Sequence, residues 1–296
     1  MSDPKEDARL SLIVVAISLA ITTLIVATVQ KDSVYIQGVS VVGISAILCF
    51  GVQWLAWAPA SFFQTERFYD LTGGLTYVAL TAITLWGGSI DSAPGPREVI
   101  VSLLVAVWSI RLSGFLFLRI HHAGKDGRFD DLKTSPTRFV IPWTLQALWV
   151  FITMNVVIVI NSQSGPSPPL GAWDAIGLLL WVTGFAIEVI ADRQKTQFNS
   201  IPENEGKWIG EGLWAVSRHP NYMGETILWL GMAFFGVACF TGLEFLAWIS
   251  PLFVYFLLTR ISGVPILDRR AMERWGDQPE YLEYREKTPE IFPFFK

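Results

Sequence analysis

Charged residues are scarce in this sequence: 16% of its 296 residues are Asp, Glu, Lys or Arg, whereas 52% are hydrophobic. A soluble domain carries about 25% charged residues. Because long apolar runs separate the charges, the sequence indicates a polytopic membrane protein and excludes a soluble one. The two cysteines, Cys49 and Cys239, both fall in apolar runs. They are typical of small core residues and form neither a disulfide framework nor a metal motif.

Several signatures of nucleotide and metal chemistry are also missing. The sequence has no Gly-x-Gly-x-x-Gly turn and no Walker sequence, so any nucleotide must be bound by a helical membrane fold. Its three histidines, His121, His122 and His219, have no cysteine cluster beside them, and we expect no metal site. A net charge of −4 argues against nucleic acid as a partner.

What the sequence does contain is a series of apolar runs, each about 20 residues long, which is the length that crosses a bilayer as a helix. They predict an all-α bundle of about eight transmembrane helices, with seven as the alternative. The predicted spans cover residues 10–29, 36–57, 71–90, 99–118, 139–160, 173–191, 221–241 and 245–264. The first run is longer than the apolar core of a cleaved signal peptide, so we treat it as a helix.

The basic residues are concentrated in every second loop of this bundle and in its termini. Of the 22 Lys and Arg, 18 lie in the N-terminus, the loop at Arg67, the loops 119–138 and 192–220, and the C-terminal tail. The positive-inside rule places these segments, and hence both termini, in the cytosol. We therefore predict one membrane domain: a cytosolic tail (1–9), a transmembrane part (10–265) and an amphipathic cytosolic tail (266–296) that packs on the bundle. A helix is expected over 268–286.

The segment 212–225 carries the densest polar chemistry and leads directly into an apolar span. It brings together five polar residues, Arg218, His219, Asn221, Tyr222 and Glu225. A helix start with Pro220 in its first turn accounts for one or two of them by capping. Because polar groups at a membrane boundary are costly, the cluster of five predicts a functional site.

A second group of polar residues lies at the cytosolic end of the sixth predicted span. Glu188 and Asp192 are four residues apart and share a helix face, where they are candidate acceptors for ribose hydroxyls or a carboxamide. The basic residues nearby are candidate phosphate ligands, although any single one is equally typical of membrane-surface anchoring. These are Lys195, Lys207, Arg218 and Arg269.

Five motifs together resemble a known family: Arg218–Glu225, Ser262–Pro265, Asp268–Arg270, Pro279–Tyr284 and Ile291–Pro293. They are similar to the steroid 5-alpha-reductase C-terminal superfamily, and most closely to its bacterial-type branch, domain of unknown function 1295. The sterol C14 and C7 reductases share a similar Arg-His-Pro-Asn-Tyr block. The resemblance is good over roughly 170–296.

The resemblance implies an oxidoreductase of the 3-oxo-5-alpha-steroid 4-dehydrogenase type, which uses NADPH to reduce a carbon–carbon double bond of a lipid or steroid-like enone. Asp192, Asn221 and Glu225 match the family's polar cofactor shell, and Lys207 stands where an Arg is usual. The full set of candidate cofactor residues is Glu188, Asp192, Lys195, Lys207, Arg218, His219, Asn221, Tyr222, Glu225, Asp268 and Arg269.

In steroid reductases a Glu and a Tyr from the N-terminal half polarise the substrate ketone. The resemblance therefore makes Glu66, Tyr69 and Asp70 the candidate catalytic residues, with Asp70 or Tyr69 stabilising the developing oxyanion. The expected partner is a lipophilic small molecule. The expected location is the plasma membrane or the endoplasmic reticulum, with the active site facing the cytosol.

Two alternatives stay open. Isoprenylcysteine carboxyl methyltransferases and related phospholipid methyltransferases carry a similar Arg-His-Pro-x-Tyr-x-Gly block, in which the motif would bind S-adenosylmethionine. Asn221 with Glu225 is more typical of the reductases. The second alternative is a lipid-binding membrane protein without catalytic activity, which predicts that the polar cluster binds no nucleotide.

Overall fold

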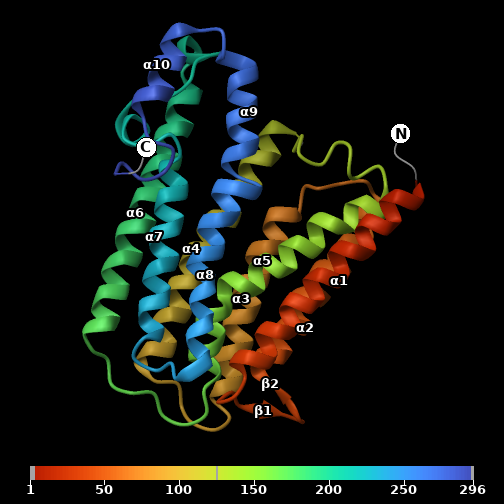
Figure 1. The fold of residues 1–296 in the computed structure, drawn as a ribbon, viewed down its shortest axis with the longest axis vertical. Coiled ribbons are helices and arrows are strands. Elements are labelled where there is room, and N and C mark those ends of the chain that lie inside the picture. Colours follow the sequence, from red (N-terminus) through yellow and green to blue (C-terminus); the bar gives the residue numbers. More distant parts are fainter. Residues whose placement is uncertain (1–3, 125, 295–296) are drawn as a thin grey trace. The chain divides into compact units, whose positions relative to one another are not determined.

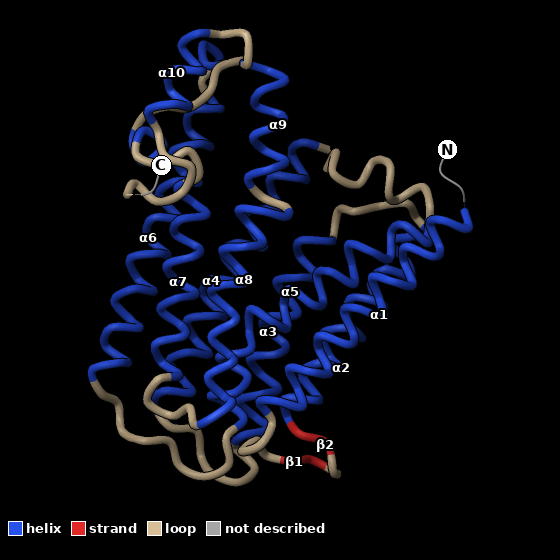
Figure 2. The backbone as a smooth tube through the Cα atoms, in the orientation of Figure 1, coloured by secondary structure: helices blue, strands red, loops and turns tan. Residues whose placement is uncertain are grey.

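A computed structural model describes residues 4–124 and 126–294. Residues 1–3 and 295–296 of the predicted tails lie outside the described part. The described chain is built almost entirely of helices (Figures 1 and 2), which confirms the predicted all-α fold. It forms two compact units. Unit 1 is the described part of Met1–Leu170 together with Gly236–Trp248, and unit 2 is Gly171–Phe235 together with Ile249–Lys296.

Unit 1 is built around one central helix, α5. In the most apolar stretch of α5, 89% of the residues are buried, whereas in that of α1 17% are buried. Helices α1, α2 and α3 all pack against α5, and Pro136 at its start needs no hydrogen-bonded N–H. The elements of unit 1 are α1 (Pro4–Val29), α2 (Val41–Phe62), α3 (Tyr69–Gly88), α4 (Pro96–Ala123), α5 (Pro136–Ser162) and the 3-10 segment η3 (Gly242–Trp248).

Unit 2 combines two long helices with a series of short ones that follow them. Its elements are α6 (Ala172–Ser200), η1 (Pro202–Asn204), η2 (Gly212–Ala215), α7 (Pro220–Gly236, whose last residue belongs to unit 1), α8 (Ile249–Phe256), the π-helical turn η4 (Leu257–Ile261), α9 (Val264–Trp275) and α10 (Pro279–Lys287).

Within the described residues, six helical segments are long and apolar enough to cross a membrane: Lys5–Val29, Val41–Phe62, Pro96–His121, Pro136–Ser162, Ala172–Ser200 and Gly242–Trp275. Each contains one of the predicted spans or most of it. The other two predicted spans, 71–90 and 221–241, correspond to helices α3 and α7. The cytosolic location of the termini and the predicted domain boundaries stay predictions.

Two predicted boundaries were wrong. The second span begins at Val41 and not at residue 36, because Tyr35–Ile36 (β1) and Val39–Ser40 (β2) form an antiparallel hairpin. Positive φ angles at Gln37 and Gly38 form its turn. The single amphipathic helix expected over 268–286 is two helices, α9 and α10, because the chain turns at Gly276 and restarts at Pro279.

Glycines bring α6 and α7 of unit 2 into backbone contact. A methyl group on Gly184 would lie 2.5 Å from the carbonyl oxygen of Gly224, and one on Gly231 would lie 2.6 Å from that of Gly177. Gly177 and Gly184 are seven residues apart on α6, and Gly224 and Gly231 are seven residues apart on α7. Membrane helices lack a hydrophobic driving force toward each other, so such close approach through small residues stabilises their packing.

This contact predicts that Gly184→Ala destabilises the protein by about 1–3 kcal/mol, since the added methyl group forces backbone atoms apart. Gly51→Ala is the matched control: Gly51 is also inside a helix, and a methyl group there meets no atom within 4 Å. Thermal unfolding in detergent measures both. Equal melting temperatures for the two variants would show that the α6–α7 contact is not tight.

Candidate functional site

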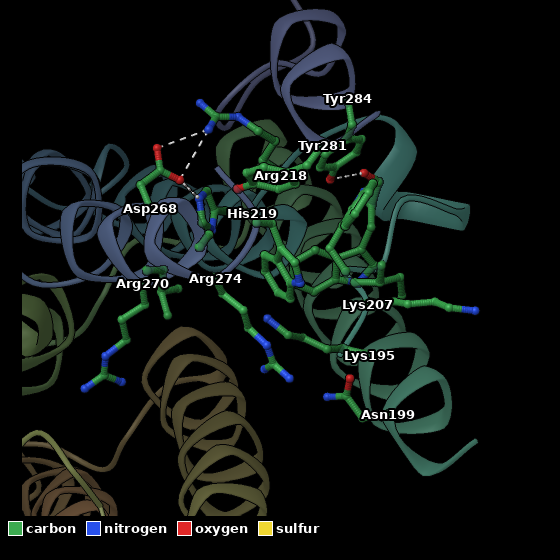
Figure 3. A pocket seen from close by; sticks show the side chains of 16 residues that line it. Lys195, Asn199, Lys207, Arg218, His219, Asp268, Arg270, Arg274, Tyr281 and Tyr284 are labelled. Carbon is green, nitrogen blue, oxygen red and sulfur yellow. Dashed lines mark hydrogen bonds and ion pairs between the residues drawn. The ribbon is translucent and has the colours of Figure 1, made fainter. Parts of the chain in front are cut away.

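Unit 2 contains a cavity of about 220 Å³, which Figure 3 shows from close by. Four segments far apart in the sequence line it. Helix α6 contributes Lys195 and Asn199. The connection between α6 and α7 contributes Lys207, Trp208, Ile209, Trp214, Arg218 and His219. Helices α9 and α10 complete the lining with Leu267, Asp268, Arg270, Ala271, Arg274, Trp275, Tyr281 and Tyr284.

Asp268 holds these segments together through its carboxylate. Its Oδ2 lies 3.1 Å from Nη1 of Arg218 and 2.8 Å from Nη2 of Arg285. Arg218 precedes α7 and Arg285 is on α10, so one α9 carboxylate joins three segments. Arg218 also lies 3.6 Å from Glu290 and donates its backbone N–H to Pro289. The C-terminal segment is thereby fastened to the Arg-His-Pro motif.

His219 lies against the same carboxylate. Its Nε2 is 3.4 Å from Oδ1 of Asp268, and its ring stacks on Tyr222 with the centroids 5.5 Å apart. Burial lowers the pKa of His219, and the neighbouring Asp268 carboxylate offsets only part of that shift. His219 is therefore neutral near pH 7 and is available as a hydrogen-bond donor or acceptor.

An aromatic cluster forms another wall of the cavity. Trp208 lies edge-on to both Trp275 and Tyr281, with centroids 6.1 Å and 5.2 Å apart. The indole N–H of Trp275 donates to the Gly206 carbonyl, and the Tyr284 hydroxyl donates to that of Trp214. These bonds fix the rings to the backbone of the α6–α7 connection, so the wall is rigid.

The remaining lining is strongly basic. Besides Arg218, which Asp268 neutralises, the cavity is lined by Lys195, Lys207, Arg270 and Arg274, while Asp268 is its only carboxylate among the lining residues described. Figure 3 shows these four extending from α6, the α6–α7 connection and α9. Such an excess of cations favours an anionic ligand.

Two buried nitrogen atoms beside this cavity have no hydrogen-bond partner among the described residues: Nε of Arg218 and Nη1 of Arg285. An unpaired buried polar atom costs roughly 1–3 kcal/mol. Both belong to guanidinium groups, which donate only. Their natural complement is a ligand with several acceptor oxygens.

The structure brings some of the predicted cofactor residues to this cavity and not others. Lys195, Lys207, Arg218, His219 and Asp268 line it. Six others do not: Glu188, Asp192, Asn221, Tyr222, Glu225 and Arg269. Arg269 is exposed on α9. The roles of all eleven stay predictions.

The buried acids lie together on the packed helices α6 and α7. Glu188, Asp192 and Glu225 are 2%, 8% and 7% exposed. A methyl group on Gly224 would lie 2.6 Å from the backbone nitrogen of Glu188, so the glycine contact places Glu188 beside the α7 turn that carries Glu225.

The three predicted catalytic residues lie in unit 1. Two of them, Glu66 and Tyr69, form hydrogen bonds to other segments of that unit. Glu66 accepts from Lys133 Nζ at 2.8 Å and from the backbone N–H of Asp126 at 3.0 Å. Burial raises the pKa of Glu66, but these hydrogen bonds outweigh it and lower the pKa overall. The Tyr69 hydroxyl donates to the carbonyl of Pro142 at 2.9 Å.

Asp70 lines a cavity in the described part of unit 1. This second cavity, of about 60 Å³, lies among α3, α4 and α5 and includes Tyr77 and Gln146 in its walls. Oδ2 of Asp70 lies 3.4 Å from Nη2 of Arg128, whose Nε donates to Asp126 at 2.7 Å. Asp126 is therefore the stronger partner of Arg128, and Asp70 remains adjacent to the cavity.

Several lining residues were not predicted. Arg270 and Arg274 are four residues apart on α9 and share a face. Their spacing in the sequence could have indicated that they line the same cavity. The aromatic wall could not be predicted from the sequence, because Trp208 and Tyr281 are 73 positions apart and come into contact only in the folded structure. The missed lining residues are Asn199, Trp208, Ile209, Trp214, Leu267, Arg270, Ala271, Arg274, Trp275, Tyr281 and Tyr284. Arg285, which pairs with Asp268 beside the cavity, was also missed.

Comparisons with known proteins bear on this architecture. The chain is 24% identical over 229 residues to an uncharacterized protein of Schizosaccharomyces pombe, covering 67% of this chain and 63% of that protein. It is 27% identical over 114 residues to a probable O-methyltransferase of Ustilaginoidea virens, covering 38% of each. The chain thus spans less than two thirds of either relative. No solved structure matches it significantly.

A family model matches residues 56–288, which include α3 to α10 and so both cavities. It is the family that the motifs from Arg218 to Pro293 resemble, so that prediction is confirmed. The chain is a membrane protein that belongs to the family described as protein of unknown function DUF1295.

Proposed function

We propose that this protein is an integral membrane oxidoreductase that uses NADPH to reduce a carbon–carbon double bond of a lipophilic enone. The observation that carries the proposal is the basic, aromatic-walled cavity of unit 2. Four cationic side chains in the lining beyond the Arg218–Asp268 pair, and two buried guanidinium N–H groups without partners, are the complement of a phosphate-bearing ligand.

The fit of NADPH to this cavity is supported by its donors and its rings. Lys195, Lys207 and Arg274 would meet phosphate oxygens, while Trp208 and Trp275 supply aromatic surface for a base. A cavity of about 220 Å³ is smaller than the ~300–1,000 Å³ typical of ligand pockets, so it would hold one end of the dinucleotide. When bound, NADPH would supply a hydride to the β carbon of the enone, and the α carbon would take a proton from solvent or from an acid.

The residues of unit 1 would act on the substrate. As the enone accepts a hydride, negative charge develops on its carbonyl oxygen, and a donor placed there stabilises the transition state. Asp70 in its protonated form is the proposed donor, because it lines a cavity and is the weaker of the two carboxylate partners of Arg128. Glu66 and Tyr69 would position the neighbouring loops.

The basic loops support a location of the cofactor cavity on the cytosolic side of a plasma or endoplasmic-reticulum membrane. Lys195, Lys207 and Arg218 belong to the segment 192–220, and Arg274 belongs to the C-terminal tail. The positive-inside rule assigns both segments to the cytosol, where NADPH is available.

An S-adenosylmethionine-dependent methyltransferase is the second candidate function. It is favoured by the likeness to a probable O-methyltransferase over 114 residues. Against it, S-adenosylmethionine carries a sulfonium cation and no phosphate. A lining with four cations beyond the Arg218–Asp268 pair disfavours such a ligand electrostatically.

The cofactor test compares the stabilising effect of ligands on the purified protein. We expect NADPH to raise the melting temperature, because a ligand that binds only the folded state stabilises it, and S-adenosylmethionine to leave it unchanged. Arg274→Gln and Lys207→Gln should each weaken NADPH binding about tenfold, since each removes a charge-assisted contact worth roughly 1.5–3 kcal/mol.

Arg193→Gln is the matched control for these variants. Arg193 is an exposed α6 cation that does not line the cavity, and its loss should leave NADPH binding unchanged. Stabilisation by S-adenosylmethionine alone would contradict the reductase and support the methyltransferase. No stabilisation by either ligand would contradict both.

The role of Asp70 has its own test. Asp70→Asn should reduce turnover of an enone substrate by at least tenfold while NADPH binding stays unchanged, because an amide donates a weaker hydrogen bond than a carboxylic acid. Asp130→Asn is the control, since Asp130 pairs with Lys133 near the same loops but does not line the cavity. Unchanged turnover in Asp70→Asn would remove Asp70 from the mechanism.

The buried imidazole of His219 makes a pH prediction. Its pKa is lowered in the folded protein, so below about pH 6.5 the unfolded chain takes up a proton that the folded one does not. Stability should therefore fall as the pH drops from 7 toward 5, by at most about 1.4 kcal/mol per pH unit for this group. His219→Gln should flatten that dependence in thermal melts. An identical pH profile in the variant would show that His219 titrates normally.

A further inference from the structure

We propose that the small cavity of unit 1 binds the hydroxyl end of a lipophilic alcohol, with Gln146 as hydrogen-bond acceptor and Trp149 as donor. Both residues line the cavity, and Oε1 of Gln146 and Nε1 of Trp149 are buried without a partner among the described residues. Gln146 as a whole is 6% exposed.

The two orphan atoms belong to residues on one face of α5. Gln146 and Trp149 are three residues apart on α5, so their side chains are neighbours on one helix face. One atom accepts a hydrogen bond and the other donates. A hydroxyl group both donates and accepts, so a single alcohol satisfies the pair, whereas a ketone or an ether satisfies only Trp149.

Glycines let helix α3 approach its neighbours closely beside this cavity. A methyl group on Gly73 would lie 2.6 Å from Nε2 of Gln146, and one on Gly74 would lie 2.3 Å from Oγ of Ser113. The amide of Gln146 therefore lies close to Gly73, in space that a larger residue there would fill.

The other polar residues of the lining have contacts of their own. Asp70 lies 3.4 Å from Arg128, and the ring of Tyr77 packs edge-on against Trp108. Ser109 and Ser113 donate their hydroxyls to carbonyls of their own helix, at Ala106 and Ser109. The other walls include Trp108, Leu112 and Val150, which are apolar. The volume of about 60 Å³ holds on the order of four water-sized groups, enough for the polar end of a lipid and not for its whole body.

The inference does not require the proposed reduction, although Asp70, the proposed donor to the enone, lines the same cavity. NADPH is assigned to unit 2, and the alcohol site lies wholly in unit 1. Failure of NADPH to bind would leave the alcohol site standing, and failure of alcohols to bind would leave the cofactor proposal standing.

The experiment measures melting temperatures in lipid nanodiscs with dodecanol, farnesol and cholesterol, each beside its methyl ether. At least one alcohol should stabilise the protein, and its ether should bind about tenfold more weakly because the ether cannot donate to Gln146. The three alcohols distinguish acyl, isoprenoid and sterol bodies.

Variants assign the effect to the two side chains. Gln146→Leu should abolish the preference for the alcohol over its ether, and Trp149→Phe should weaken both ligands. Gln53→Leu and Trp143→Phe are matched controls, because each removes another buried orphan atom of unit 1 that does not line the cavity. If Gln146→Leu does not fold, Trp149→Phe carries the test.

Three outcomes would overturn the proposal. Equal binding of alcohol and ether would show that no donor is recognised. Equal effects of the Gln146 and Gln53 variants on alcohol binding would show that the cavity is not the site. Absence of stabilisation by any of the three alcohols would show that the cavity holds water only.

Discussion

The carboxylate of Asp268 is the contact on which the architecture of unit 2 depends. It joins α9 to the segment before α7 through Arg218 and His219, and to α10 through Arg285. Breaking a buried ion pair leaves an uncompensated charge and is strongly destabilising. Asp268 is the one carboxylate among the described residues that line the cavity, and two guanidinium groups are paired with it. The same contact therefore shapes a cavity whose lining is mainly basic.

Close backbone approach through glycine is the second constraint, and it recurs in both units. In unit 2 the pairs Gly184–Gly224 and Gly177–Gly231 set the spacing of α6 and α7, and they position the buried acids of both helices. In unit 1, Gly73 and Gly74 let α3 approach α5 and α4, and a small cavity remains between them. Because lipid offers no hydrophobic force between helices, backbone proximity and polar contacts determine how such helices pack.

The two cavities differ in chemistry. The cavity of unit 2 is basic and aromatic, and its unpaired atoms are donors. The cavity of unit 1 is mainly apolar and presents one acceptor and one donor on the same helix face. The first suits a charged, water-soluble ligand and the second the polar end of a lipid.

The sequence by itself determined the helical membrane fold, because apolar runs of about 20 residues have few alternatives in lipid. It also determined the family, through the motifs from Arg218 to Pro293, and it marked Lys195, Lys207, Arg218, His219 and Asp268 as site residues that the structure brings to one cavity. It did not reveal the β-hairpin before α2 or the break between α9 and α10, which depend on single turns at Gly38 and Gly276. Only the tertiary structure decided that Trp208, Trp275 and Tyr281 form one wall, that Tyr69 is committed to a backbone carbonyl, and that Gln146 and Trp149 share a cavity. These facts depend on how helices pack, and packing is decided by contacts between residues far apart in the chain.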